Sequence, residues 1–153
     1  MKFLRSAAIA AILVPVTAVA AIAAAPNPAF KARHDNFEAM GRAMKGIMDE
    51  FRKPAPSVQV IQANAAALAA AAPKVGRQFP KGTGPEAGVK TEALPVIWEK
   101  PAEFSAAAKR LAGETANLRN VSRTGDLAAI QQAVGKVGQS CKVCHDTFRK
   151  PRS

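Results

Sequence analysis

The chain has 153 residues and a net charge of +11, a length that suits one modest domain. Strongly basic proteins often bind nucleic acids, but here the basic residues are scattered along the chain and aromatic residues make up only 5% of it. We therefore expect no nucleic-acid partner.

The chain begins with a pattern typical of a cleaved secretory signal peptide. Lys2 and Arg5 give a positive start, residues 6–20 carry no charge, and small residues follow. We expect residues 1–24 to be removed, with the cut between residues 20 and 25, and residues 25–153 to form a single domain. Pro15 and the many alanines argue against an uncleaved anchor, because a membrane span needs about 20 strongly apolar residues. The mature protein is then expected in the periplasm, without a membrane partner.

The rest of the chain predicts four helices and no strand, since apolar residues recur at steps of three or four rather than two. Prolines end the first helix, and Ser57 is placed to cap the second. A Gly- and Pro-rich connection over residues 73–95 follows, and Thr124-Gly125-Asp126 ends the third helix and caps the last. The expected helices are 28–51, 57–72, about 94–123 and 127–149. Helices of this number and length predict an all-α, antiparallel four-helix bundle.

The strongest signal in the sequence is Cys141-x-x-Cys144-His145, in the last predicted helix. The pattern C-x-x-C-H is typical of covalent haem attachment. At about 100° of rotation per residue, the three side chains fall within an arc of about 100° and can face one edge of a porphyrin. The two thiols would bond the vinyl groups and His145 would ligate the iron. We therefore expect one haem c.

Other uses of the two cysteines fit less well. A dithiol oxidoreductase places C-x-x-C at the start of a helix that follows a strand, whereas this motif lies deep in the last helix. A structural zinc site needs four ligands, and the chain offers only one further histidine, His34, and no further cysteine. No carboxylate pair, serine–histidine arrangement or phosphate-binding loop is evident. We expect no catalytic residues, and a protein that is not an enzyme.

Together these features resemble the cytochrome c′ family, the four-helix-bundle branch of the c-type cytochromes. The resemblance covers nearly all of residues 25–153. It is carried by Arg33-x-x-x-Phe37-x-x-Met40-Gly41, Phe79-Pro80-x-Gly82-Thr83-Gly84, Ala93-Leu94-Pro95-x-Ile97-Trp98 and Cys141-x-x-Cys144-His145-x-x-Phe148-Arg149. It implies a left-handed bundle that is usually a homodimer through its first two helices.

The resemblance also implies a haem whose only protein ligand is His145, with an apolar residue of the first helix over the opposite face. Alignment on Gly41 places Phe37 at that distal position, and phenylalanine has no lone pair to offer to iron. In low-spin relatives a methionine at this position ligates the iron instead. Arg33 and Arg149 resemble family positions near the haem propionates and the proximal histidine, with a solvated surface as the alternative for each.

The residues leave other arrangements open. Met40 and Met44 lie one and two helical turns from Phe37, and a thioether is an ordinary haem ligand. Methionines at helical spacing are, however, more often flexible core packing. His34 could form a bis-histidine haem or lie at the surface. Trp98 and Phe104 are expected in the core.

The function expected from these residues is that of an exported monohaem c-type cytochrome with five-coordinate, high-spin haem. Such a protein would bind the diatomic gases NO and CO, transfer electrons, or do both. Its basic surface would suit acidic redox partner proteins. The alternative is a six-coordinate, low-spin electron carrier in which a methionine, Met40 or Met44, is the sixth ligand.

Overall fold

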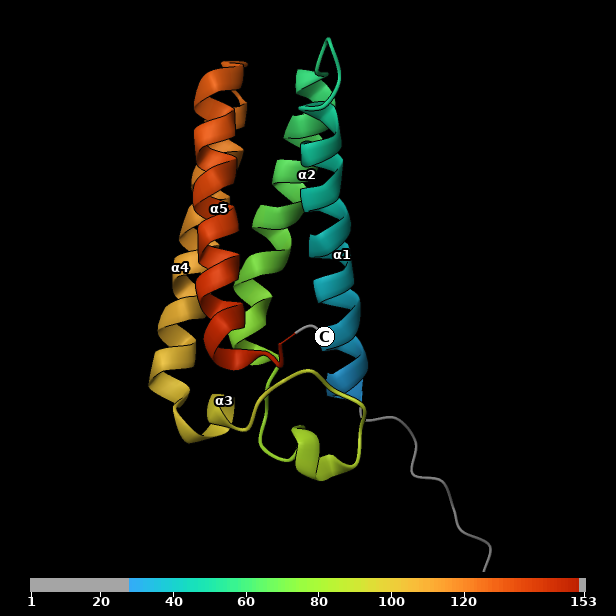
Figure 1. The fold of residues 1–153 in the computed structure, drawn as a ribbon, viewed down its shortest axis with the longest axis vertical. Helices are drawn as coiled ribbons and strands as arrows, with labels where there is room; N and C mark the ends of the chain where they lie inside the picture. Colours follow the sequence, from blue (N-terminus) through green and yellow to red (C-terminus); the bar gives the residue numbers. More distant parts are fainter. Residues whose placement is uncertain (1–27, 152–153) are drawn as a thin grey trace, which may run out of the picture.

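The computed structural model describes residues 28–151, so the predicted signal peptide lies outside the described residues. Four long helices run side by side along the long axis of the molecule (Figure 1). They are α1 (Pro28–Glu50), α2 (Val58–Ala71), α4 (Pro101–Ser122) and α5 (Leu127–Phe148). Shorter elements are η1 (Ala72–Arg77), η2 (Pro85–Ala87) and α3 (Val96–Glu99). The prediction of an all-α four-helix bundle is confirmed.

Two of the predicted helix caps are present. Ser57 lies in an extended conformation before α2, and its hydroxyl accepts a hydrogen bond from the N–H of Val60 at 3.4 Å. Asp126 precedes α5, and its carboxylate accepts hydrogen bonds from Ala128 N and Ala129 N at 2.9 and 3.1 Å. These bonds satisfy amide groups that have no partner within the helix.

The third predicted helix is wrong in one respect, because the chain breaks it in two. Residues Val96–Glu99 form α3, and α4 begins afresh at Pro101. Lys100, between them, has φ −123° and ψ 59°, outside the helical region. The cause is Pro101, whose ring disfavours helical backbone in the preceding residue but suits the first position of a new helix.

The core lies mainly between α1, α2, α4 and α5, and its fully buried side chains include Ile47, Ile61, Leu68, Leu118, Ile130 and Val137. Within the described residues α1 packs against α2, α2 against α4 and α4 against α5, whereas α1 and α5 make few close contacts with each other. Apolar residues of these two helices that are only half-buried include Phe37 and Met44 of α1 and Cys141 and Cys144 of α5. The side of the bundle between α1 and α5 is therefore the least tightly closed.

The long connection before α3 folds over the end of the bundle where α1 begins and α5 ends (Figure 1). It is tied to the end of α5 by two backbone hydrogen bonds, Leu94 N to Phe148 O at 3.0 Å and Lys150 N to Glu92 O at 2.8 Å. An isolated antiparallel bridge pairs Ala93 with Arg149. This end of the bundle thus brings together the start of α1, the connection and the Cys–His motif.

None of the helices described is both long and apolar enough to cross a membrane.

Candidate haem site

The last turns of α5 carry the attachment motif. Cys141 and Cys144 are half-buried against the core, and His145 is exposed. Cys141 and His145 both line a pocket of about 560 Å³. Its other lining residues are Gly138, Lys142, Asp146, Arg149, Lys150 and Pro151. The helix therefore presents one thiol and the imidazole to a common space, with the second thiol one turn along and also packed against the core.

The two thiols have the electrostatics of unreactive cysteines. Burial raises the pKa of Cys141. Burial also raises the pKa of Cys144, and the neighbouring Cys141 raises it further. Thiol–disulfide enzymes instead lower the pKa of the attacking thiol, commonly at a helix N-terminus. Cys141 and Cys144 lie in the second half of a 22-residue helix, so they are poorly placed for thiol exchange.

The donor set fits a covalently attached haem better than a metal ion. Within residues 28–151, no three His, Cys, Asp or Glu side chains come together to hold a metal. Covalent attachment of haem c uses two thiols at this spacing and a histidine directly after the second, which α5 supplies. It also needs room beside α5, and the loosely closed side toward α1 provides it.

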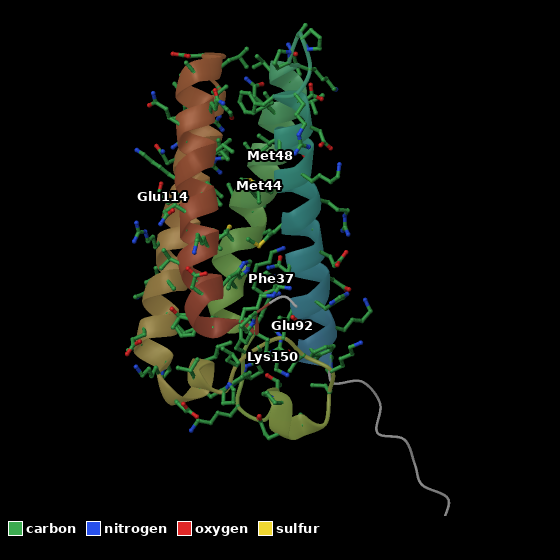
Figure 2. The ribbon with its side chains drawn as sticks, viewed as in Figure 1. Phe37, Met44, Met48, Glu92, Glu114 and Lys150 are labelled. Carbon is green, nitrogen blue, oxygen red and sulfur yellow. The ribbon has the colours of Figure 1, made fainter. Side chains whose placement is uncertain are left out.

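Phe37 and Met44 lie between α1 and α5 (Figure 2). Phe37 is half-buried, and its ring meets that of Phe79 edge to face, with 6.2 Å between the ring centres. The Met44 Cε atom lies 4.0 Å from the place that a Cβ would take on Gly138 of α5. Both α1 side chains thus face the helix that carries the motif.

Met40 is more deeply buried than Phe37 and Met44. It is 7% exposed, and its sulfur accepts a weak hydrogen bond from Asn36 Nδ2 at 3.9 Å. The same Asn36 nitrogen donates to Ala71 O of α2 at 3.2 Å. Met40 therefore packs where α1 meets α2, as a core methionine does.

Arg33 and Arg149 differ in their surroundings. Arg33 is 4% exposed, which rules out a solvated surface position, and burial lowers its pKa. Arg149 lines the pocket together with His145, and its Nη2 lies 3.7 Å from Glu92 Oε2. His34 is exposed, as its surface alternative predicts.

Sequence reasoning gave no role to Phe79, although its segment carried part of the family resemblance. The structure places Phe79 between Phe37 and two further aromatic rings, those of Trp98 and Phe104. The prediction of a core position holds for Phe104, which is buried, whereas Trp98 is only half-buried. Its role could have been suspected from its place, a phenylalanine within a Gly- and Pro-rich connection, because apolar side chains in such segments commonly anchor them to the core.

Known proteins are similar to this chain over most of its length. The family model described as "Cytochrome C'" matches residues 28–149. Cytochrome c' of Pararhodospirillum photometricum is 36% identical over 123 residues, which cover 80% of this chain and 90% of the relative.

Solved structures agree as well. A cytochrome c' with ligand-controlled dimer dissociation has a TM-score of 0.74 at 27% identity, covering 84% of this chain and all 100% of that one. A nitric oxide complex of a mutant cytochrome c prime from Alcaligenes xylosoxidans has a TM-score of 0.70 at 27% identity, covering 80% of this chain and 94% of that one. The chain therefore belongs to the cytochrome c′ family of haem proteins.

Proposed function

We propose that this protein is an exported, periplasmic cytochrome c′ that binds nitric oxide and carbon monoxide at a five-coordinate haem and also transfers electrons. Cys141 and Cys144 would hold the haem covalently, and His145 would be its only protein ligand. Bound haem supplies an iron that cycles between the ferric and ferrous states and has one open face. The protein would act without turning over a substrate.

The observation that carries the proposal is the position of Phe37. It lies between α1 and α5 (Figure 2), is half-buried, and has no atom able to ligate iron. Met40, one turn along, is buried in the core and contacts Asn36. The chain thus offers an apolar ring where a six-coordinate relative would offer a sulfur.

Phe37 also gives a basis for selectivity. Its ring supplies no hydrogen-bond donor, and polar donors in the distal pocket are among the features that decide whether dioxygen binds. Access to the open face requires the ring to move, so small diatomic gases are favoured on size. The nitric oxide complex of the Alcaligenes xylosoxidans relative supports this ligand class.

A six-coordinate, low-spin electron carrier is the second candidate, and Met44 is the residue that favours it. Met44 is half-buried and faces α5 near Gly138. Its thioether would have to occupy the sixth coordination position of the iron, where we propose that a gas binds. In that case the protein would transfer electrons, and acidic redox partners would meet its basic surface.

The visible absorption spectrum separates the two. We expect a high-spin spectrum in the purified oxidised and reduced protein, and a shift when carbon monoxide is added to the reduced form. A low-spin spectrum that carbon monoxide does not change would overturn the gas-binding function and leave the electron carrier.

We also propose that the protein forms a homodimer through α1 and α2. Val60 of α2 is 40% exposed, which leaves apolar surface on this helix. The solved cytochrome c' with ligand-controlled dimer dissociation supports a dimeric assembly. Sedimentation equilibrium should give twice the monomer mass, and substitution of Val60 by glutamate should give the monomer. A wild-type monomer at all concentrations would exclude the dimer.

A further inference from the structure

Phe79 belongs to the connection before α3, yet its ring reaches the candidate distal residue. The Phe79 and Phe37 rings meet edge to face at 72°, with 6.2 Å between their centres. Phe37 is half-buried, and Phe79 is the aromatic side chain against which it rests. Edge-to-face pairs are favourable beyond the area that they bury, so this contact favours one orientation of Phe37.

The Phe79 ring is itself held by other groups. Its centre lies 4.8 Å from that of Phe104 and 5.9 Å from that of Trp98. The guanidinium carbon of Arg33 lies 4.5 Å from the ring centre, within the range of a cation–π interaction. Movement of the Phe79 ring would disturb all three contacts.

The backbone on either side of Phe79 is also fixed. Trp98 Nε1 donates hydrogen bonds to Phe79 O at 3.1 Å and to Pro80 O at 3.0 Å. Thr83 Oγ1 donates to Pro80 O at 2.7 Å, and Arg33 Nη2 donates to Thr83 O at 3.0 Å. Phe79 is therefore anchored through both its ring and its main chain, whereas Phe37 lies on the loosely closed side of the bundle.

We propose that Phe79 is a positioning residue that holds Phe37 over the distal face and thereby slows the access of gas to the haem. This inference rests on the proposed function, because it assigns a second residue to the same open face. Phe79 acts only through Phe37. Before gas can bind, the Phe37 ring must leave its contact with Phe79, while the anchored Phe79 cannot follow it.

The test is a cycle of variants of the reduced holoprotein, with carbon monoxide association measured by flash photolysis. F79L removes the ring contact, F37A removes the proposed barrier, and the double variant combines them. We expect F79L to speed association about three- to tenfold, the effect of weakening one aromatic contact. In the F37A background the same change should have no further effect, because coupled residues are not additive. If F79L does not fold, F79M replaces it.

F51L is the matched control. Phe51 is also a half-buried phenylalanine packed on the core, but it follows the other end of α1. Its substitution should leave the association rate unchanged. An F79L rate equal to that of the wild type, or an equal acceleration by F79L with and without Phe37, would overturn the proposal.

Crystal structures of the gas-free wild type and F79L give a readout that does not depend on gas binding. We expect one Phe37 orientation in the wild type and more than one in F79L. A single, unchanged orientation in both would overturn the proposal even if gas binds. If the wild type binds no carbon monoxide, the proposed function fails, and these structures still decide whether Phe79 positions Phe37.

Discussion

The Arg33 side chain donates a hydrogen bond of 3.0 Å from Nη2 to the backbone carbonyl of Thr83, 50 residues along the chain. A second bond of 3.4 Å joins Nη1 to the Thr83 hydroxyl. None of the ion pairs among residues 28–151 includes Arg33, although it is buried. Hydrogen bonds and the faces of Phe30 and Phe79 therefore surround this cation in place of a carboxylate.

Replacement of Arg33 by alanine should destabilise the protein. It leaves Thr83 O without its donor and removes the cation from the Phe79 ring. Because hydrogen bonds to charged groups are worth about 1.5–3 kcal/mol, we expect R33A to lower the free energy of unfolding by about that amount in urea titrations. R42A is the control, since Arg42 forms only an exposed pair with Glu38. Equal stabilities of the two variants would show that the Thr83 contact contributes little.

Glu50 should make part of the stability depend on pH. Its carboxylate accepts hydrogen bonds from Lys53 Nζ and from Ser57 N at the start of α2, and these two contacts lower its pKa. A lowered folded-state pKa gives stability that is fully present above the unfolded value of about 4.3 and is lost as the pH falls through the folded value.

We therefore expect E50Q to be less stable than the wild type at pH 7, and the difference to shrink as the pH falls below about 4. Urea unfolding followed across a pH series measures both quantities. E38Q serves as the control, because Glu38 is in an exposed pair. A stability difference between E50Q and the wild type that stays constant with pH would show that the Glu50 charge is not responsible.

Substitutions of three α1 residues should separate the two candidate coordination states. F37M places a thioether between α1 and α5, and we expect it to give a low-spin spectrum and slower carbon monoxide binding. M40A should leave the spectrum unchanged, because Met40 is buried in the core and its sulfur contacts Asn36. M44A should also leave it unchanged if the haem is five-coordinate. A wild-type low-spin spectrum that M44A converts to high spin would instead identify Met44 as the sixth ligand.

Much of the fold could be predicted because its signals are local. The hydroxyl of Ser57 and the carboxylate of Asp126 cap the helices that follow them, and a cap depends only on its own turn. The motif at Cys141, Cys144 and His145 is equally local, since a single helix sets the relative positions of the three side chains. The break before Pro101 also has a local cause, the proline itself. It was not predicted because the apolar periodicity of the region indicates one continuous helix.

The contacts of Arg33 and Phe79 could not be predicted in this way. An arginine on a helix is usually expected to be exposed. Arg33 is buried because the connection before α3 passes over it. That path is set by long-range contacts, among them the bonds from Trp98 Nε1 to the carbonyls of Phe79 and Pro80. Which residue supports Phe37 therefore follows from tertiary structure and not from helical periodicity.

Two helical glycines should respond differently to the addition of a methyl group. Gly113 of α4 is exposed, and a Cβ there meets nothing within 4 Å. Alanine has a better helix propensity, so G113A should raise the free energy of unfolding by about 0.5–1 kcal/mol. A Cβ on Gly46 of α1 would instead lie 2.8 Å from Asn64 Nδ2 of α2. The same substitution there must displace Asn64 from its hydrogen bond with Val60 O.

We therefore expect G46A to give no gain in stability, although its helix propensity improves as much as that of G113A. If Asn64 is the obstacle, adding G46A to an N64A background should recover a gain of about 0.5–1 kcal/mol, because the two residues are in contact and their effects are not additive. Urea unfolding of the four variants in this cycle measures the coupling. A G46A protein as stable as G113A would show that the Asn64 side chain moves aside at little cost, and that its contact with Gly46 is not a constraint on the sequence.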